Sequence, residues 1–276
     1  MMRHSLCIAV AISCGVGAAT LAAQTQPASG YIRTYCVKVQ PGKDVEFRKL
    51  MSDTFRAVGQ VRADAGEYKG RALLRTVFPA GAAAECDYMM TNLYTGFPPD
   101  PKASMSPEVA HQKAHVMSAS DFFAKRDATS RLRRTELWRV VELIGALDVG
   151  NYIRLDYMKV QPDQRADWLK NERDTYKAIH QANIDLDAMK AWSLNTLMMP
   201  SGSSLPYDAM TGNVYKNWTQ IDTGRAKYAE AFKKAHPNMD LAQTSARGAK
   251  LRDLVRTELY EVVDMTKPAT STSSTQ

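Results

Sequence analysis

The chain has 276 residues, of which 36 are lysine or arginine and 29 are aspartate or glutamate, giving a formal net charge of +7. The basic residues are scattered among acidic ones without a basic run, which favours an ordinary solvated surface over a nucleic-acid interface. Hydrophobic residues make up 45% of the chain, so it can bury a proper core in one or two domains without depending on disulfides for stability.

The first 23 residues predict a signal peptide. Arg3 and His4 precede an apolar run of small residues that ends near Ala23, and polar sequence follows. This run is rich in alanine and glycine and is too short to be a convincing transmembrane helix. We therefore expect a secreted or periplasmic protein that has no membrane span after cleavage, with a linker over residues 24–30. Lipid attachment at Cys14 is the less favoured alternative.

From residue 31 onward, a pattern of strands and helices can be followed along the chain. The segment YIRTYCVKVQP at 31–41 is rich in β-branched and aromatic residues and ends at a proline, which predicts a strand. Apolar residues at helical spacing between Phe47 and Val58 predict an amphipathic helix. The segments ALLRTVFPAG and CDYMMTNLYTGF then predict two strands, the first closed by a Pro-x-Gly turn. A helical stretch and a last strand at 134–142, RTELWRVVE, complete the pattern.

The same pattern occurs a second time, 121 to 122 residues later. The segment YIRLDYMKVQP at 152–162 shares seven of eleven residues with 31–41, and RTELYEVVD at 256–264 repeats the last strand. Between these ends, 14 of 51 aligned positions are identical, where average composition predicts about three. The sequence therefore predicts a tandem duplication, with units at 31–145 and 151–264 and a disordered tail at 265–276.

The order strand, helix, strand, strand, helix, strand is that of a ferredoxin-like βαββαβ unit. Two such units of about 115 residues, each with an extra short helix before the last strand, resemble the dimeric α+β barrel superfamily in a fused tandem form. The resemblance covers nearly all of 31–264. It implies an α+β fold in which two antiparallel sheets pack face to face through the faces that carry no helices, with ligand space between the two sheets.

Strand alternation divides the duplicated strands into two sets of side chains, and we assign the more apolar set to the helices. The other set would then project between the two sheets as candidate ligand-binding residues. Its alternative role is a buried network of charged and polar groups that fixes the register of the sheets. This set comprises Arg33, Asn92, Tyr94, Glu136, Trp138, Arg154, Asn213, Tyr215, Glu258 and Tyr260.

His115 and His236 close equivalent KAH tripeptides and are the candidate catalytic residues. A histidine at such a place could transfer protons or bind haem iron, but it could equally cap the carbonyl groups at a helix C-terminus. His111 and His115 are four residues apart, yet no carboxylate follows at ligand spacing, so no metal site is predicted. Cys36 and Cys86 fall on strands that would be neighbours, where a disulfide and two free thiols are equally compatible with the sequence.

Common catalytic and cofactor-binding motifs do not identify a reaction for this sequence. CxxC, HExxH, GxSxG and the phosphate-binding glycine loops are missing from residues 24–276. We therefore predict an exported protein that binds a small polar or aromatic molecule between its sheets, without a cofactor. Two alternatives remain open. One is an enzyme on the same scaffold, for which the resemblance implies either a cofactor-free monooxygenase or isomerase or a chlorite dismutase-like haem protein. The other is a structural envelope protein. The sequence leaves open whether the chain forms oligomers.

Overall fold

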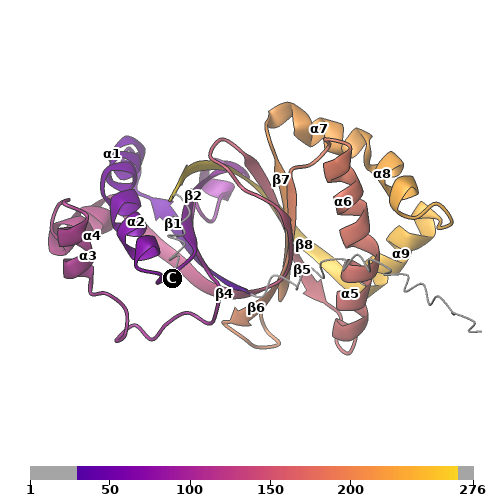
Figure 1. Ribbon diagram of the computed structural model, residues 1–276, viewed down its shortest axis with the longest axis horizontal. Helices are drawn as coiled ribbons and strands as arrows, with labels where there is room; N and C mark the ends of the chain where they lie inside the picture. The colour runs from indigo at the N-terminus through magenta and orange to yellow at the C-terminus, as the bar shows by residue number, and fades with distance from the viewer. Residues whose placement is uncertain (1–29, 267–276) are drawn as a thin grey trace, which may run out of the picture.

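The structure is a computed structural model that describes residues 30–266 (Figure 1). The predicted signal peptide, nearly all of the predicted linker and residues 267–276 of the predicted tail lie outside the described residues. The first half contains four strands: β1 (Gly30–Val39), β2 (Gly70–Phe78), β3 (Tyr88–Tyr94) and β4 (Ser130–Gly145). Its helical segments are α1 (Asp44–Leu50), η1 (Met51–Phe55), α2 (Arg56–Asp64), η2 (Gly81–Ala83), α3 (Pro107–Lys113) and α4 (Ala119–Thr129).

The second half has the same order of strands. These are β5 (Tyr152–Val160), β6 (Ala191–Met199), β7 (Ala209–Tyr215) and β8 (Arg252–Met265). Its helical segments are α5 (Arg165–Asn171), η3 (Glu172–Tyr176), α6 (Lys177–Asp185), α7 (Trp218–Ala226), α8 (Tyr228–Ala235) and α9 (Leu241–Leu251). The bounds of β2, β3, η1 and α2 recur in β6, β7, η3 and α6 at an offset of 121 residues, as in the sequence alignment.

All eight strands form one closed antiparallel barrel in the order β1-β3-β2-β8-β5-β7-β6-β4. The expectation of two separate sheets packed face to face is therefore wrong. Within each half the order is that of a ferredoxin-like sheet, but the edge strands pair across the halves, β2 with β8 and β4 with β6. A separate sheet would leave unpaired N–H and C=O groups along both edges, and closure gives each edge strand a partner.

The helices lie outside the barrel, those of the first half on one side and those of the second half on the other (Figure 1). In the first half Phe47, Met51 and Phe122 of the helices pack on Tyr88 and Met90 of the sheet. In the second half Trp168 and Leu251 pack on Trp192 and Leu194 in the same way. Among the described residues, no helix combines the length and apolar character that crossing a membrane requires.

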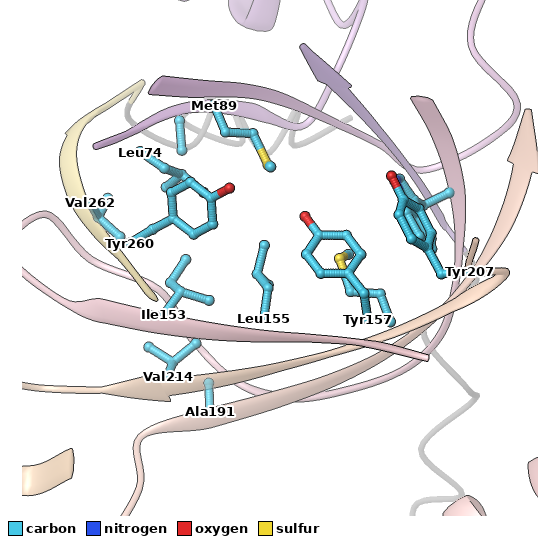
Figure 2. Close-up of a cluster of buried hydrophobic side chains, with 13 residues drawn as sticks. Leu74, Met89, Ile153, Leu155, Tyr157, Ala191, Tyr207, Val214, Tyr260 and Val262 are labelled. Carbon is cyan, nitrogen blue, oxygen red and sulfur yellow. The ribbon is translucent and has the colours of Figure 1, made fainter. Parts of the chain in front are cut away.

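The barrel interior holds a second core (Figure 2). Leu74, Met89, Ile153, Leu155 and Val262 point inward together with the rings of several aromatic residues. Much of the barrel wall is thus buried on both faces, by helices outside and by the opposite wall inside. This double burial removes the polar face that normally identifies the outside of an antiparallel sheet.

Gly145 provides a test of the junction where the two halves join. It ends β4, has a φ of +77°, and pairs with Ala191 of β6. A Cβ at Gly145 would lie 2.8 Å from the Cα of Ala191 and closer still to the carbonyl oxygen of Lys190. Gly145→Ala should lower the free energy of unfolding by about 1–2 kcal/mol through the positive φ, and by about 1–3 kcal/mol more through overpacking. Chemical denaturation measures both.

Gly150→Ala is the matched control, because Gly150 has a φ of +85° but no atom within 4 Å of an added Cβ. It should show only the backbone part of the loss. Equal losses at the two positions would contradict close packing at the junction between β4 and β6.

Candidate functional site

The ten predicted ligand-binding residues separate into two groups. Glu136, Trp138, Glu258 and Tyr260 lie inside the barrel, all at most 4% exposed. The other six face the helices, and the expectation that they project into the barrel is wrong. They are Arg33, Asn92 and Tyr94 in the first half and Arg154, Asn213 and Tyr215 in the second. Ligand binding by any of the ten remains a prediction.

The assignment was wrong because the more apolar face of each strand was expected to pack on the helices. Ile32 and Ile153, assigned to the helices, pair with Trp138 and Tyr260 across β4 and β8 and so point into the barrel. Their neighbours along the strands, such as Arg33, therefore point out toward the helices. The barrel thus takes Ile32 of β1 and Ile153 and Leu155 of β5, while Arg33 and Arg154 lie on the helix side.

Three of the six outward-facing residues, Arg33, Asn92 and Tyr94, line a pocket in the first half, between the sheet and its helices. The cavity volume is about 520 Å³, within the range that holds small organic ligands. Strands β1, β2 and β3 form its floor, and its walls come from η1, α2, α3, α4 and the loop after β3. Residues that line it include Arg33, Tyr35, Met51, Phe55, Arg62, Glu67, Tyr68, Arg71, Met90, Asn92, Tyr94, Met105, His111, Phe122, Phe123, Arg126 and Asp127.

Arg71 is held at the base of this pocket by aromatic rings and neutral acceptors. Its guanidinium carbon lies 3.8 Å from the ring centroid of Phe55 and 5.1 Å from that of Tyr68. Its Nε donates to Asn92 Oδ1 at 2.9 Å, and Nη1 donates to the Phe55 carbonyl oxygen at 3.2 Å. Burial lowers the pKa of Arg71, because a buried guanidinium loses the hydration that stabilises its charge.

Arg33 lies on the same floor, on the other side of Asn92 of β3 from Arg71. Its guanidinium carbon is 5.9 Å from the ring centroid of Tyr94. Within residues 30–266, neither Arg33 nor Arg71 forms an ion pair with a carboxylate. The other two arginines of the lining are compensated, since Arg62 pairs with Glu67 and Arg126 with Asp127. The pocket therefore combines apolar aromatic walls with two positive charges that lack a negative partner in this part of the chain.

His111 adds a titratable group to the wall. It is 4% exposed, its ring packs on Phe122 at a centroid distance of 5.3 Å, and its Nδ1 is 2.8 Å from the Met117 carbonyl oxygen. A carbonyl oxygen can only accept, so Nδ1 carries the proton and the neutral ring has its lone pair on Nε2. The sequence analysis considered His111 only as a metal ligand, and its role in the pocket wall was missed.

The equivalent region of the second half is filled. Trp192 stands where the first half has Arg71, and His180 stands where it has Gly59; their rings stack with centroids 4.9 Å apart. Arg154, the counterpart of Arg33, pairs with Asp156 at 2.9 Å. Burial and then the charge of Arg154 lower the pKa of His180 to about 3, so the imidazole is neutral. The duplicated architecture thus has an open, positive pocket in one half and a packed, compensated interior in the other.

Glu172, also in the second half, gives a pH prediction. It is 4% exposed, and burial raises its pKa from 4.5 to about 7, although the charge of Arg252 acts in the opposite direction. The unfolded chain loses this proton near pH 4.5 while the folded protein keeps it. The stabilisation that the folded protein gains from protonated Glu172 is therefore fully present below pH 4.5. It is lost as pH rises through about 7. Glu172→Gln should remove this pH dependence. The free energy of unfolding of the variant, relative to that of the wild type, should therefore rise by roughly 3 kcal/mol between pH 4.5 and 7.5.

Denaturation at several pH values measures this gain. Asp174→Asn is the control, because Asp174 is an exposed carboxylate two residues away that pairs with Lys170. Its difference from the wild type should stay nearly constant over the same range. A constant difference for Glu172→Gln as well would show that the Glu172 carboxyl is not protonated in the folded protein.

The two histidines predicted from the KAH tripeptides do not reach the pocket. His115 is exposed after α3, with a φ of +53°. His236 ends α8, and its Nε2 lies 3.0 Å from the Thr175 carbonyl oxygen. Neither position fits an iron ligand facing a cavity, so we derive no chemistry through haem at these residues. Across residues 30–266, no group of three or more His, Cys, Asp or Glu side chains is arranged to hold a metal ion.

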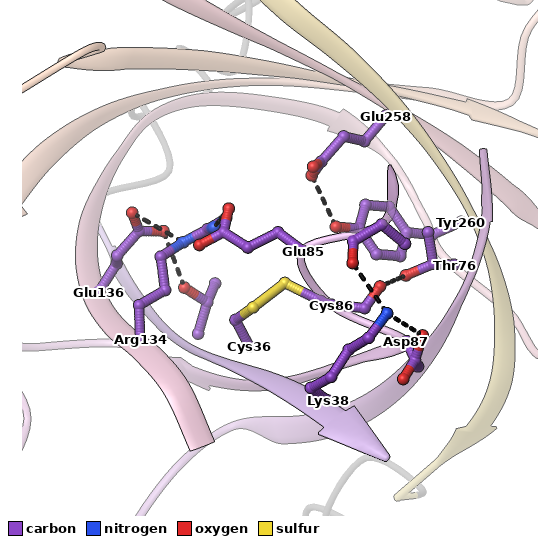
Figure 3. The surroundings of a disulfide bond; sticks show 12 residues. Cys36, Lys38, Thr76, Glu85, Cys86, Asp87, Arg134, Glu136, Glu258 and Tyr260 are labelled. Carbon is purple, nitrogen blue, oxygen red and sulfur yellow. Dashed lines mark hydrogen bonds and ion pairs between the residues drawn. A yellow bond between two sulfur atoms is a disulfide. The ribbon is translucent and has the colours of Figure 1, made fainter. Parts of the chain in front are cut away.

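The inward-facing polar residues form a network near one end of the barrel, beside a disulfide between Cys36 and Cys86 (Figure 3). Glu136 accepts a hydrogen bond from the hydroxyl of Tyr207, and Glu258 accepts one from Tyr260 at 2.7 Å. The disulfide resolves the choice that the sequence left open. In the second half Tyr157 and Tyr207 stand at the two cysteine positions, and their rings contact each other at a centroid distance of 4.9 Å.

Comparisons with known proteins support the fold and leave the activity open. No protein-family model matches the sequence, and no curated protein matches it. A candidate monooxygenase from Fusobacterium nucleatum has 12% identity and a TM-score of 0.53, over 87% of this chain and 95% of that one. A candidate monooxygenase from Lactobacillus acidophilus has 12% identity and a TM-score of 0.49, over 87% of this chain and 96% of that one. A candidate chlorite dismutase has 12% identity and a TM-score of 0.47, over 86% of this chain and 96% of that one. Only the first exceeds 0.5, and at 12% identity it shows a shared fold.

Proposed function

We propose that this protein binds a small planar organic anion, such as an aromatic carboxylate, in the pocket of its first half. The observation that carries the proposal is the pair Arg33 and Arg71. Both guanidinium groups line an aromatic cavity, and neither has a carboxylate partner within residues 30–266. Burial of the Arg71 guanidinium without a counter-charge is costly, whereas Arg33 is only half-buried and hydrogen-bonds to Tyr35; an anionic ligand would compensate both charges.

The pocket walls indicate the rest of the ligand. Phe55, Tyr68, Phe122 and Phe123 offer ring faces and edges to a flat apolar body. Arginine suits the other end of such a molecule, because its planar fork can donate two parallel hydrogen bonds to a carboxylate. A ligand with an aromatic ring and one acidic group therefore matches the pocket better than a sugar or an inorganic ion.

The packed second half supports the same proposal. There the duplicated arginine, Arg154, has its own carboxylate in Asp156, and Trp192 fills the place of Arg71. We infer that the protein arose by tandem duplication and that one copy kept an open pocket while the other became structural. We also propose that it is exported, on the basis of the predicted signal peptide at residues 1–23.

Arg33→Met tests the proposal, with 1-anilinonaphthalene-8-sulfonate as a fluorescent aromatic anion. The wild type should bind this probe at one saturable site, and benzoate should compete with it better than benzyl alcohol does. Loss of the Arg33 charge should weaken probe binding by about tenfold or more, because a charge-assisted hydrogen bond contributes about 1.5–3 kcal/mol. Fluorescence titration measures the affinities.

The matched control is Arg154→Met, which removes the equivalent arginine from the second half. It should leave the affinity for the probe nearly unchanged and should lower the melting temperature, because it breaks the ion pair with Asp156. Equal loss of affinity in the two variants, or equal competition by benzoate and benzyl alcohol, would refute the proposed site.

A second candidate function is oxidation of the bound molecule. It rests on His111, whose Nε2 carries a lone pair in the pocket wall and could take a proton from a phenolic ligand. The candidate monooxygenase from Fusobacterium nucleatum shares the fold. Oxygen uptake with an electron-rich phenol, abolished in His111→Gln, would support this function.

A further inference from the structure

A second binding site is indicated at one end of the barrel, away from the pocket of the first half. Arg134 of β4 and Arg256 of β8 both project inward there. The two strands stand opposite each other in the barrel, since three strands separate them in either direction around it. Both guanidinium groups nevertheless reach the same carboxylate, that of Glu85, which lies in the loop between β2 and β3. Figure 3 shows Arg134 beside Glu85 and Glu136.

The two arginines are also held by their own strands. Arg134 Nε lies 3.2 Å from Glu136 Oε1, and Arg256 Nε lies 3.5 Å from Glu258 Oε1. The guanidinium carbon of Arg256 is 4.4 Å from the ring centroid of Tyr157, a ring that Arg134 approaches to 6.0 Å from the other wall. These ion pairs and ring contacts place both arginines beside Glu136, Glu258 and Tyr157, while the side-chain hydrogen bonds that they form within residues 30–266 go to Glu85.

Charge and exposure distinguish Glu85 from the other two glutamates. Glu136 and Glu258 balance the two arginines and have side chains only 4% and 5% exposed, whereas the side chain of Glu85 is 38% exposed. The charges of Arg134 and Arg256 are thus already balanced by Glu136 and Glu258. Glu85 adds a third carboxylate to these two ion pairs. In the second half its place is taken by Pro206, so the duplicated pattern does not require an acidic residue there.

The network also contains buried donors that Glu85 leaves unused. The Nη2 atoms of Arg134 and Arg256 and the hydroxyl of Tyr157 are buried, with no hydrogen-bond partner in the described part of the chain. Tyr157 is itself fully buried, and burial raises the pKa of its hydroxyl, which therefore keeps its proton. Buried donors without acceptors are uncommon in folded proteins and indicate a place for a polar group.

We propose that this end of the barrel is a binding site for a small organic carboxylate, and that Glu85 is its internal occupant. An incoming carboxylate replaces Glu85 charge for charge between Arg134 and Arg256. Its second oxygen, or a neighbouring hydroxyl group, can accept from the donors that Glu85 does not reach. The loop around Glu85 supplies the movable part, and the barrel strands supply the fixed part.

Chemical rescue of Glu85→Ala tests this proposal. The variant should have a lower melting temperature than the wild type, because two arginines lose a shared partner, and sodium acetate should restore it in a saturable way. Sodium chloride at equal ionic strength should not. By calorimetry the variant should bind acetate at least about tenfold more tightly than the wild type, in which Glu85 competes.

Two further variants make the result decisive. Glu85→Ala combined with Arg256→Met should lose the response to acetate. Glu85→Gln keeps the size of the side chain and removes its charge, so it permits the same titration if Glu85→Ala does not fold. Equal responses to acetate and chloride, or equal acetate affinity in the wild type and in the Glu85 variant, would overturn the proposal. Glu85 would then be a structural member of the network only.

Discussion

The pairing of strands across the two halves is the interaction on which the rest of the structure depends. β2 pairs with β8 and β4 with β6, so neither half has a free sheet edge at these strands. Closure puts the inner faces of both sheets around one shared core, and it directs all helices outward (Figure 1). The two candidate sites follow from this division. One lies between helices and sheet in the first half, and the other lies inside the barrel where both halves contribute.

The two halves differ in how the charges of their equivalent arginines are compensated. Arg33 and Arg154 occupy equivalent positions, but only Arg154 has a carboxylate beside it, because Asp156 stands where the first half has Tyr35. Inside the barrel, by contrast, the arginines of the two halves have equivalent partners. Arg134 and Arg256 keep the same role in both halves, and the element that breaks the symmetry, Glu85, comes from a loop.

The order of elements could be predicted from the sequence because it depends on local patterns. The strand at 31–41, the helix from Phe47 and the Pro-x-Gly turns are each defined within a few residues. The closure of the sheets and the direction of the side chains could not, since both depend on which edges and faces meet in space. In a sheet that is buried on both sides, an aliphatic residue such as Ile32 suits either face. Arg33 was misplaced for this reason, while His111 and Glu85 gave no signal without the fold around them.

The positions of the first and last described residues carry one more consequence. Gly30 starts β1 beside Tyr94 of β3, and the Thr266 backbone N–H donates to the Arg71 carbonyl oxygen of β2, so both lie at the same end of the barrel. The order in which the two halves occur along the chain is therefore not dictated by the barrel. A circular permutant that joins residue 266 to residue 30 through a short linker and opens between 146 and 150 would retain every strand pairing. Two chains could equally exchange whole halves and close the same barrel as a domain-swapped dimer.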